Sequence, residues 1–126
     1  MTEAARPSRT GTAHIEAQTD LTAKVFVWGE LHAGDCQQDN GRITFWSDGT
    51  GWWSCTTLTY HTHTGDIWHA RFTAKSSAGV TLFETPTFDS PRMDDGNPPP
   101  RYNWSAPFVF EPDWFEAIGG VSQHYR

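Results

Sequence analysis

The fold is decided by the stretch Leu58-Thr59-Tyr60-His61-Thr62-His63-Thr64-Gly65-Asp66-Ile67-Trp68-His69-Ala70-Arg71-Phe72. A three-residue turn over 64–66 predicts a β-hairpin in which His63 faces Ile67 and His61 faces His69. A slip of one residue would mix apolar and polar side chains on each face, so the pattern itself favours this register. The register places Leu58, Tyr60, Trp68 and Phe72 on an apolar face, and Thr59, His61, His63, His69 and Arg71 on a polar face.

Further strands are predicted on both sides of this segment. Aromatic-rich or alternating runs indicate strands over 24–31, 42–47, 52–63, 67–74, 80–85 and 102–110. Asp48-Gly49 and Asn40-Gly41 predict tight turns, because these dipeptides tolerate positive φ. The segment 89–101 contains several prolines and no periodicity, so we expect a long loop there.

Strands joined mostly by tight turns predict an all-β fold. We expect a small antiparallel β-barrel, calycin-like, of about six to eight strands with one short C-terminal helix. Pro112 is placed to begin that helix and Gly119-Gly120 to end it. A β-sandwich is the alternative, but closure into a barrel would remove exposed strand edges. The barrel domain is assigned to residues 21–126, and residues 1–20 are expected to be a disordered leader.

Charge and hydropathy exclude several classes of function. The chain of 126 residues has a formal net charge of −6 and no Lys/Arg stripe, which argues against nucleic-acid partners and anionic membrane surfaces. Its apolar runs are far shorter than the roughly 20 residues that cross a bilayer. The first residues lack the apolar core of a secretory signal, so we expect a cytoplasmic protein. In a reducing compartment we expect Cys36 and Cys55 to be free thiols. A disulfide bond between them is the alternative.

The polar face of the predicted hairpin is the candidate site. It continues upstream through Trp53, Cys55 and Thr57, and this mixture of side chains is typical of a pocket that holds a small molecule. Four residues are expected to polarise a carbonyl group of the ligand or to exchange protons with it: His61, His69, Arg71 and Tyr102. The residues expected to contact it are Trp53, Thr59, His63, Trp104, Asp94 and Asp95.

Two other interpretations of this face remain open. Three clustered histidines could bind Zn, Cu or Fe, with Asp66 or Glu84 as a further ligand. The same side chains could instead form a solvated surface. The loop at 89–101 is interpreted either as a lid that carries a carboxylate to the pocket or as a surface loop stiffened by Pro98-Pro99-Pro100. We expect no metal and no cofactor.

Several segments resemble an uncharacterised family of short actinobacterial proteins over roughly residues 24–125. They are Gly34-Asp35-Cys36, Asp48-Gly49-Thr50-Gly51-Trp52, the range 56–63, Gly65-Asp66-Ile67-Trp68-His69 and the range 89–104. In size and pattern the chain is also similar to small β-barrel cyclases of polyketide pathways, a likeness of architecture alone.

This second likeness implies a cofactor-free cyclase or isomerase that holds an apolar natural-product intermediate in an aromatic-lined pocket. The alternative is a non-catalytic binding module for a hydrophobic small molecule or a glycan. A cupin-like metal enzyme is the second alternative. The expected partner is a small-molecule ligand or substrate. A second copy of the chain, forming a homodimer, is a further alternative.

Overall fold

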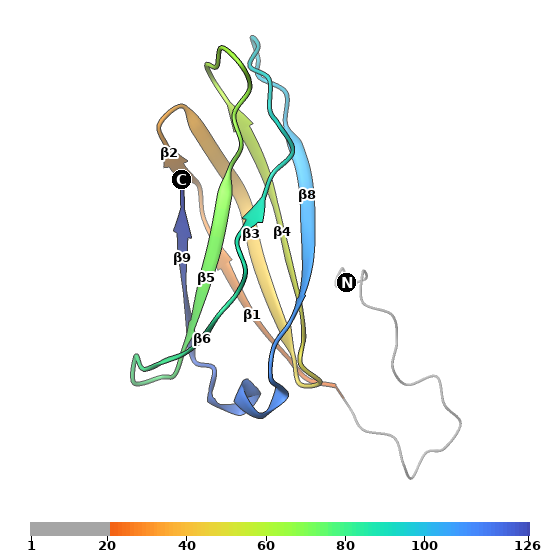
Figure 1. Cartoon of the computed structure of the whole chain (residues 1–126), viewed down its shortest axis with the longest axis vertical. Coiled ribbons are helices and arrows are strands. Elements are labelled where there is room, and N and C mark those ends of the chain that lie inside the picture. The colour runs from red at the N-terminus through yellow and green to blue at the C-terminus, as the bar shows by residue number, and fades with distance from the viewer. Residues whose placement is uncertain (1–20) are drawn as a thin grey trace, which may run out of the picture.

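The computed structural model describes residues 21–126, which form two antiparallel β-sheets (Figure 1). The leader expected over 1–20 lies outside the described residues. The first sheet contains β1 (Ala23–Trp28), β2 (Leu31–Ala33), β3 (Cys36–Trp46), β4 (Thr50–Thr59) and β8 (Tyr102–Val109). The second contains β5 (His69–Lys75), β6 (Thr81–Glu84), β7 (Phe88–Asp89) and β9 (Gly120–Tyr125). The all-β prediction is confirmed. Within residues 21–126 the sheets do not close into the expected barrel.

Each sheet is organised around a central strand. In the first sheet β3 pairs with β4, and β4 pairs in turn with β8. The other edge of β3 is shared by β2, which pairs with Cys36–Gln38, and β1, which pairs with the range 41–46. In the second sheet β5 pairs with β9 along nearly its whole length, while β6 and β7 pair with its two ends.

The predicted hairpin between residues 58 and 72 is wrong. Strands β4 and β5 lie in different sheets, because both edges of β4 are already occupied by β3 and β8. The segment between them, residues 60–68, crosses from one sheet to the other at the upper end of the molecule (Figure 1). His61 therefore does not face His69, whose partner in the sheet is Asp89 of β7.

The two glycine-containing dipeptides behave differently. Asp48-Gly49 forms the predicted turn between β3 and β4, with Gly49 at φ 89°. Asn40-Gly41 instead lies inside β3, where the register with β4 shifts between Asp39 and Arg42 and Asn40 adopts φ 56°. The positive φ at Asn40 therefore belongs to a β-bulge within the strand and not to a turn.

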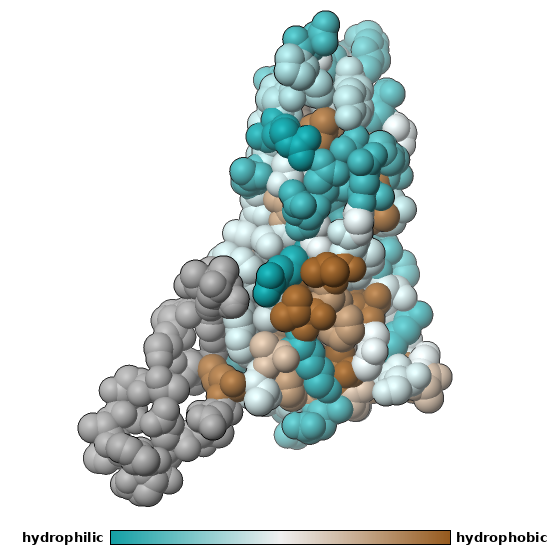
Figure 2. Space-filling model, turned by 180° about the vertical axis from the view of Figure 1, so that it is seen from behind, coloured by the Kyte–Doolittle hydropathy of each residue, from teal (hydrophilic) through white to brown (hydrophobic). Residues whose placement is uncertain are grey.

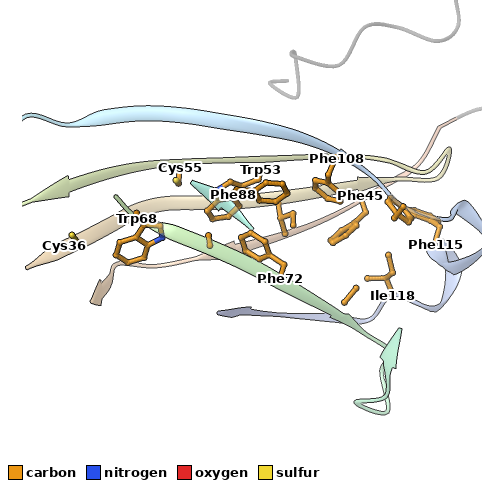
Figure 3. Packing of buried hydrophobic residues seen from close by; sticks show 14 of the residues in the cluster. Cys36, Phe45, Trp53, Cys55, Trp68, Phe72, Phe88, Phe108, Phe115 and Ile118 are labelled. Atoms are coloured by element: carbon orange, nitrogen blue, oxygen red, sulfur yellow. The ribbon is translucent and has the colours of Figure 1, made fainter. Parts of the chain in front are cut away.

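Aromatic side chains fill the space between the sheets (Figure 3). Trp53 of β4 and Phe72 of β5 are fully buried, and their ring centroids are 4.5 Å apart. Trp28 lies against both rings, at 5.9 Å from Trp53 and 5.5 Å from Phe72. These contacts join the two sheets, since large aromatic rings contribute most of the burial in a small β domain.

The predicted terminal helix is a short 3₁₀ helix, η2 (Pro112–Ala117), and a strand follows it. Phe115 and Ile118 are buried as expected, whereas Trp114 is 41% exposed. Lys24 Nζ donates to the carbonyl oxygens of Phe115, Glu116 and Ile118 at 2.8, 3.1 and 2.9 Å. A lysine at this end donates to carbonyl groups of the last helical turn, of which the Phe115 oxygen also accepts from the backbone N–H of Ile118 at 3.2 Å.

Cys36 and Cys55 are both free and buried. Cys36 lies opposite Thr59 in the register of β3 and β4, four residues along the strand from Cys55. Four residues of a strand span about 13 Å, which is too far for a disulfide bond. No helix within residues 21–126 is long and apolar enough to span a membrane.

Candidate functional site

A cavity of about 490 Å³ opens at the end of the sandwich where residues 60–68 cross between the sheets. We call it the loop-end pocket. Its lining combines carboxylates, imidazoles, hydroxyls and one guanidinium with the apolar side chains of Ala33 and Ile67. The lining residues are Ala33, Asp35, Cys36, His61, Thr62, His63, Thr64, Asp66, Ile67 and Arg126.

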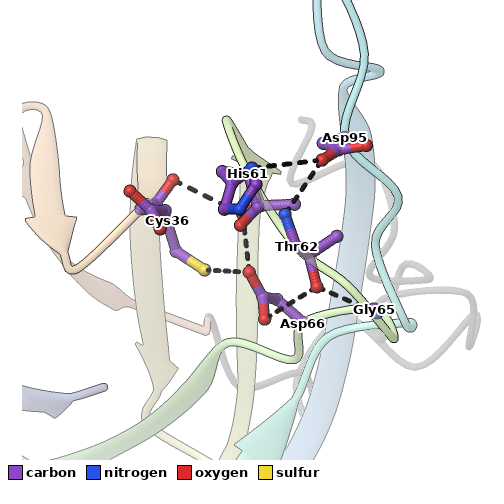
Figure 4. A network of polar contacts seen from close by, with 8 residues as sticks. Cys36, His61, Thr62, Gly65, Asp66 and Asp95 are labelled. Carbon is purple, nitrogen blue, oxygen red and sulfur yellow. Dashed lines mark hydrogen bonds and ion pairs between the residues drawn. The ribbon is translucent and has the colours of Figure 1, made fainter.

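Asp66 is the centre of the hydrogen-bond network in this pocket (Figure 4). Its Oδ2 accepts from the Thr59 hydroxyl at 2.6 Å and from the Cys36 thiol at 3.6 Å. Its Oδ1 accepts from the Thr62 hydroxyl at 3.2 Å. Thr62 Oγ1 in turn accepts from the backbone N–H of Gly65 at 2.9 Å, which closes the turn before Asp66. One carboxylate thus connects β3, β4 and the crossing segment.

The hydrogen bonds of this network, together with burial, shift the pKa values of Asp66 and Cys36. The Thr59 hydroxyl bond lowers the pKa of Asp66 most strongly; burial opposes this effect, and bonds from Thr62 and Cys36 lower the pKa further. Burial raises the pKa of the Cys36 thiol, and the neighbouring Asp66 charge adds to that rise. Burial also raises the pKa of the Cys55 thiol. Since the thiolate is the nucleophilic form, neither cysteine is prepared for nucleophilic chemistry.

The proline-containing loop at 89–101 holds the crossing segment from outside. Asp66 and Met93 exchange backbone hydrogen bonds of 3.1 and 2.8 Å, and Met93 is fully buried. Asp95 Oδ2 accepts from the backbone N–H of Thr62 at 2.9 Å. Arg92 Nη1 donates to the carbonyl oxygen of Thr64 at 2.8 Å. The predicted loop is therefore present, and it braces the pocket wall.

The two histidines of the crossing segment project into solvent at the pocket. The ring centroids of His61 and His63 are 4.9 Å apart, with their planes nearly perpendicular. His61 Nδ1 lies 4.0 Å from Asp95 Oδ2. The His61 side chain is 64% exposed, so a ligand can reach its ring directly.

A second cavity, of about 270 Å³, lies on the outer face of the second sheet. We call it the sheet-face pocket. His69 Nδ1 is paired with Asp89 Oδ1 at 2.6 Å, and Arg71 Nη1 donates to Glu84 Oε1 at 2.6 Å. Arg126 lines both this pocket and the loop-end pocket. The lining residues are His69, Arg71, Thr87, His124, Tyr125 and Arg126.

The sequence-predicted residues divide among three places. His61 and His63 line the loop-end pocket, with Thr59 and Asp95 bonded to its wall, whereas His69 and Arg71 line the sheet-face pocket. Of the rest, Asp94 is exposed on the loop at 89–101, and the three aromatic residues belong to the interior or its margin. Trp53 is buried in the core, Trp104 Nε1 donates to Thr57 Oγ1 at 3.0 Å, and the Tyr102 hydroxyl accepts from the backbone N–H of Asp94 at 2.9 Å.

The expected cluster of three histidines is not assembled, because His69 lines the sheet-face pocket, paired with Asp89, while His61 and His63 line the loop-end pocket. Glu84 lies beside Arg71, not beside His61. Over the part of the chain that the structure describes, no three His, Cys, Asp or Glu side chains are grouped to hold a metal ion.

Sequence reasoning missed the importance of Asp66, His124 and Arg126. The sequence places Asp66 in a predicted turn and offers it as a metal ligand, but it does not predict that Thr59, Thr62 and Cys36 all donate to this carboxylate. The segment Thr62-His63-Thr64-Gly65-Asp66 carries the signal of a side-chain-stabilised turn, in which a threonine hydroxyl binds a nearby backbone N–H. His124 and Arg126 were missed because β9 was missed: Gly119-Gly120 was interpreted as a stop, and the strand that follows it was not considered.

A family model matches residues 42–126, which is more than half of the chain. The chain belongs to DUF6294, a family of unknown function. The predicted resemblance to an uncharacterised family is confirmed, and the DUF6294 match includes the crossing segment, both histidines at the loop end and every strand of the second sheet. The comparisons with curated proteins and with solved structures find no match.

Proposed function

We propose that this chain is a non-catalytic binding module whose loop-end pocket takes a small polyhydroxylated ligand, such as a sugar residue of a glycan. The observation that carries this proposal is the composition of the pocket lining. Carboxylates of Asp35 and Asp66 supply acceptors, while His61, His63 and Arg126 supply donors. A sugar hydroxyl both donates and accepts, so it needs both kinds of partner at close quarters.

The wall of the pocket is also rigid enough to recognise a ligand. Asp66 is fixed by three side-chain donors, and the crossing segment is bonded to the loop at 89–101 through Asp95 and Arg92. Rigid polar groups lose little conformational entropy when a ligand binds. The exposed rings of His61 and His63, together with Ile67, offer the apolar contact that the C–H faces of a sugar need.

The surface of the molecule agrees with a polar ligand. Seen from behind, side chains over the upper part of the molecule are mostly hydrophilic, and apolar side chains gather over the lower part (Figure 2). The loop-end pocket lies at the upper end.

A ring-closing enzyme for an apolar intermediate has less support from this geometry. The aromatic side chains expected to line its pocket are largely packed against one another, with Trp53 fully buried against Phe72. The raised pKa of Cys36 also keeps its thiol protonated, so this thiol is not activated as a nucleophile at the loop end.

A glycan array probed with the full chain tests the proposal. We expect binding to a defined group of glycans, and we expect the double variant His61→Ala/His63→Ala to lose it. His32→Ala is the matched control, because His32 is an exposed histidine outside the pocket lining. Binding to no glycan, or equal binding by the double variant and the wild type, would overturn the proposal.

A further inference from the structure

The sheet-face pocket gathers arginine and histidine side chains in an acidic chain. The chain carries only 9 Lys and Arg against 15 Asp and Glu, yet Arg71 and Arg126 both line this one cavity. Two of the six histidines, His69 and His124, line it as well. No Asp or Glu is among its described lining residues; Glu84 and Asp89 reach it only through their bonds to Arg71 and His69.

The sheet register explains why these side chains converge. Arg71 of β5 lies directly opposite His124 of β9. His69 stands two residues before Arg71 on the same outer face, because Ala70 and Phe72 between and after them are buried. Arg126 is held beside His69 by two backbone hydrogen bonds, of 2.9 and 3.1 Å. The positions are therefore fixed by main-chain pairing.

We propose that the sheet-face pocket binds a small oxyanion, the phosphate or carboxylate group of a small molecule. Arginine suits this task because its guanidinium presents five N–H donors in a planar fork that matches such groups. The Thr87 hydroxyl adds a further hydrogen-bond donor to the lining. A volume of about 270 Å³ accommodates a small anion or the charged end of a larger metabolite.

The two nearby carboxylates orient the donors. Glu84 Oε1 accepts from Arg71 Nη1 at 2.6 Å, and Asp89 Oδ1 lies 2.6 Å from His69 Nδ1. Neither carboxylate residue lines the cavity. Arg71 has further N–H groups for a ligand after this bond, and His69 has its second ring nitrogen. His124 is positioned by Thr73, whose Oγ1 lies 2.9 Å from His124 Nε2.

The test is a sulfate titration of the full chain followed by ¹H–¹⁵N NMR, with acetate as a second probe. Sulfate keeps its charge near neutral pH, so any pH effect reports on the protein. We expect saturable shifts at His69, Arg71 and His124, and we expect Arg126→Gln to weaken binding about tenfold. Glu84→Gln should strengthen it, because it removes a negative charge beside the anion while the amide oxygen can still accept from Arg71 Nη1. Tighter binding of sulfate would indicate a tetrahedral oxyanion such as phosphate as the ligand group. Tighter binding of acetate would indicate a planar carboxylate.

Lys75→Gln is the matched control, since Lys75 is a cation on β5 that does not line the pocket. It should leave the affinity for sulfate nearly unchanged, as should His63→Ala in the loop-end pocket. Two results would overturn the proposal: the absence of saturable shifts with both probes, or equal weakening by Lys75→Gln and Arg126→Gln. A loss of glycan binding at the other pocket leaves this outcome unaffected.

Discussion

At the scale of single residues, Asp66 organises the loop end. Its carboxylate receives the hydroxyls of Thr59 and Thr62 and the thiol of Cys36, and its backbone pairs with Met93. A bond to a charged acceptor contributes more than a neutral bond, and without it the buried Thr59 hydroxyl keeps only the longer contacts to the carbonyl oxygens of Asp35 and His61, at 3.5 and 3.3 Å. The bonds that hold the pocket wall in place are therefore made to the charged form of Asp66.

We expect Asp66→Asn to lower the free energy of unfolding at neutral pH by about 1–3 kcal/mol. Because the pKa of Asp66 is lowered on folding, its stabilisation is complete above the ordinary aspartate pKa and is lost as the pH falls through the folded value. The difference between wild type and variant should thus shrink in acid. Urea unfolding at neutral pH and at about pH 3 measures this. Asp94→Asn, a change at an exposed aspartate of the neighbouring loop, should have little effect at either pH.

The two thiols give a second prediction at this scale. Burial raises the pKa of both Cys36 and Cys55, so little thiolate is present at neutral pH. We expect both to react with iodoacetamide far more slowly in the folded protein than in urea, as followed by mass spectrometry. Rapid alkylation of Cys36 in the native chain would contradict this description of the site.

At the scale of elements, turns and bulges determine where the side chains of the site are placed. Both Gly49, between β3 and β4, and Gly79, between β5 and β6, adopt positive φ, at 89° and 85°. A Cβ at Gly49 would lie 2.6 Å from the carbonyl oxygen of Phe110, whereas a Cβ at Gly79 would have nothing within 4 Å.

These two glycines therefore separate backbone strain from steric contact. We expect Gly79→Ala to cost about 1 kcal/mol from strain alone. Gly49→Ala should cost about 2 kcal/mol more, because the new methyl group must displace β8 or the start of η2. Urea unfolding of the two variants measures both values, and equal costs would show that the hairpin turn does not pack against Phe110.

The elements also show what the sequence could predict. Alternation and turn dipeptides located β4, β5, β6 and β8 to within a few residues, because these signals are local. The pairing of β4 with β8 instead of β5 depends on which distant strand occupies each edge, and no local pattern contains that information. The polar-face argument failed for the same reason: Thr57 and Thr59 face the interior between the sheets, where they are fully buried. Hence His61 and His69 were expected together and lie in different pockets.

At the scale of the whole molecule, the two sheets are joined by aromatic packing. Trp53 contacts rings from three other strands, Trp28 of β1, Phe72 of β5 and Trp104 of β8. The core thus spans both sheets, and both pockets lie at its margins.

Two tryptophans test this division. Trp53→Ala should lower the free energy of unfolding by about 3–5 kcal/mol, because it removes a fully buried ring from the interface between the sheets. Trp114→Ala makes the same change at a side chain that is 41% exposed and should cost well under about 1–2 kcal/mol. Thermal unfolding of both variants gives the comparison. Similar losses would mean that Trp53 is not part of a sheet-joining core.

The most direct test of the proposed function is a ¹H–¹⁵N NMR titration of the full chain with methyl glycosides of glucose, galactose, mannose and N-acetylglucosamine. The loop-end pocket predicts saturable shifts at Thr62, His63 and Asp66 with at least one of these sugars, and no comparable change at His32. Saturable shifts confined to other parts of the molecule, or no saturable shift with any of the four, would contradict it.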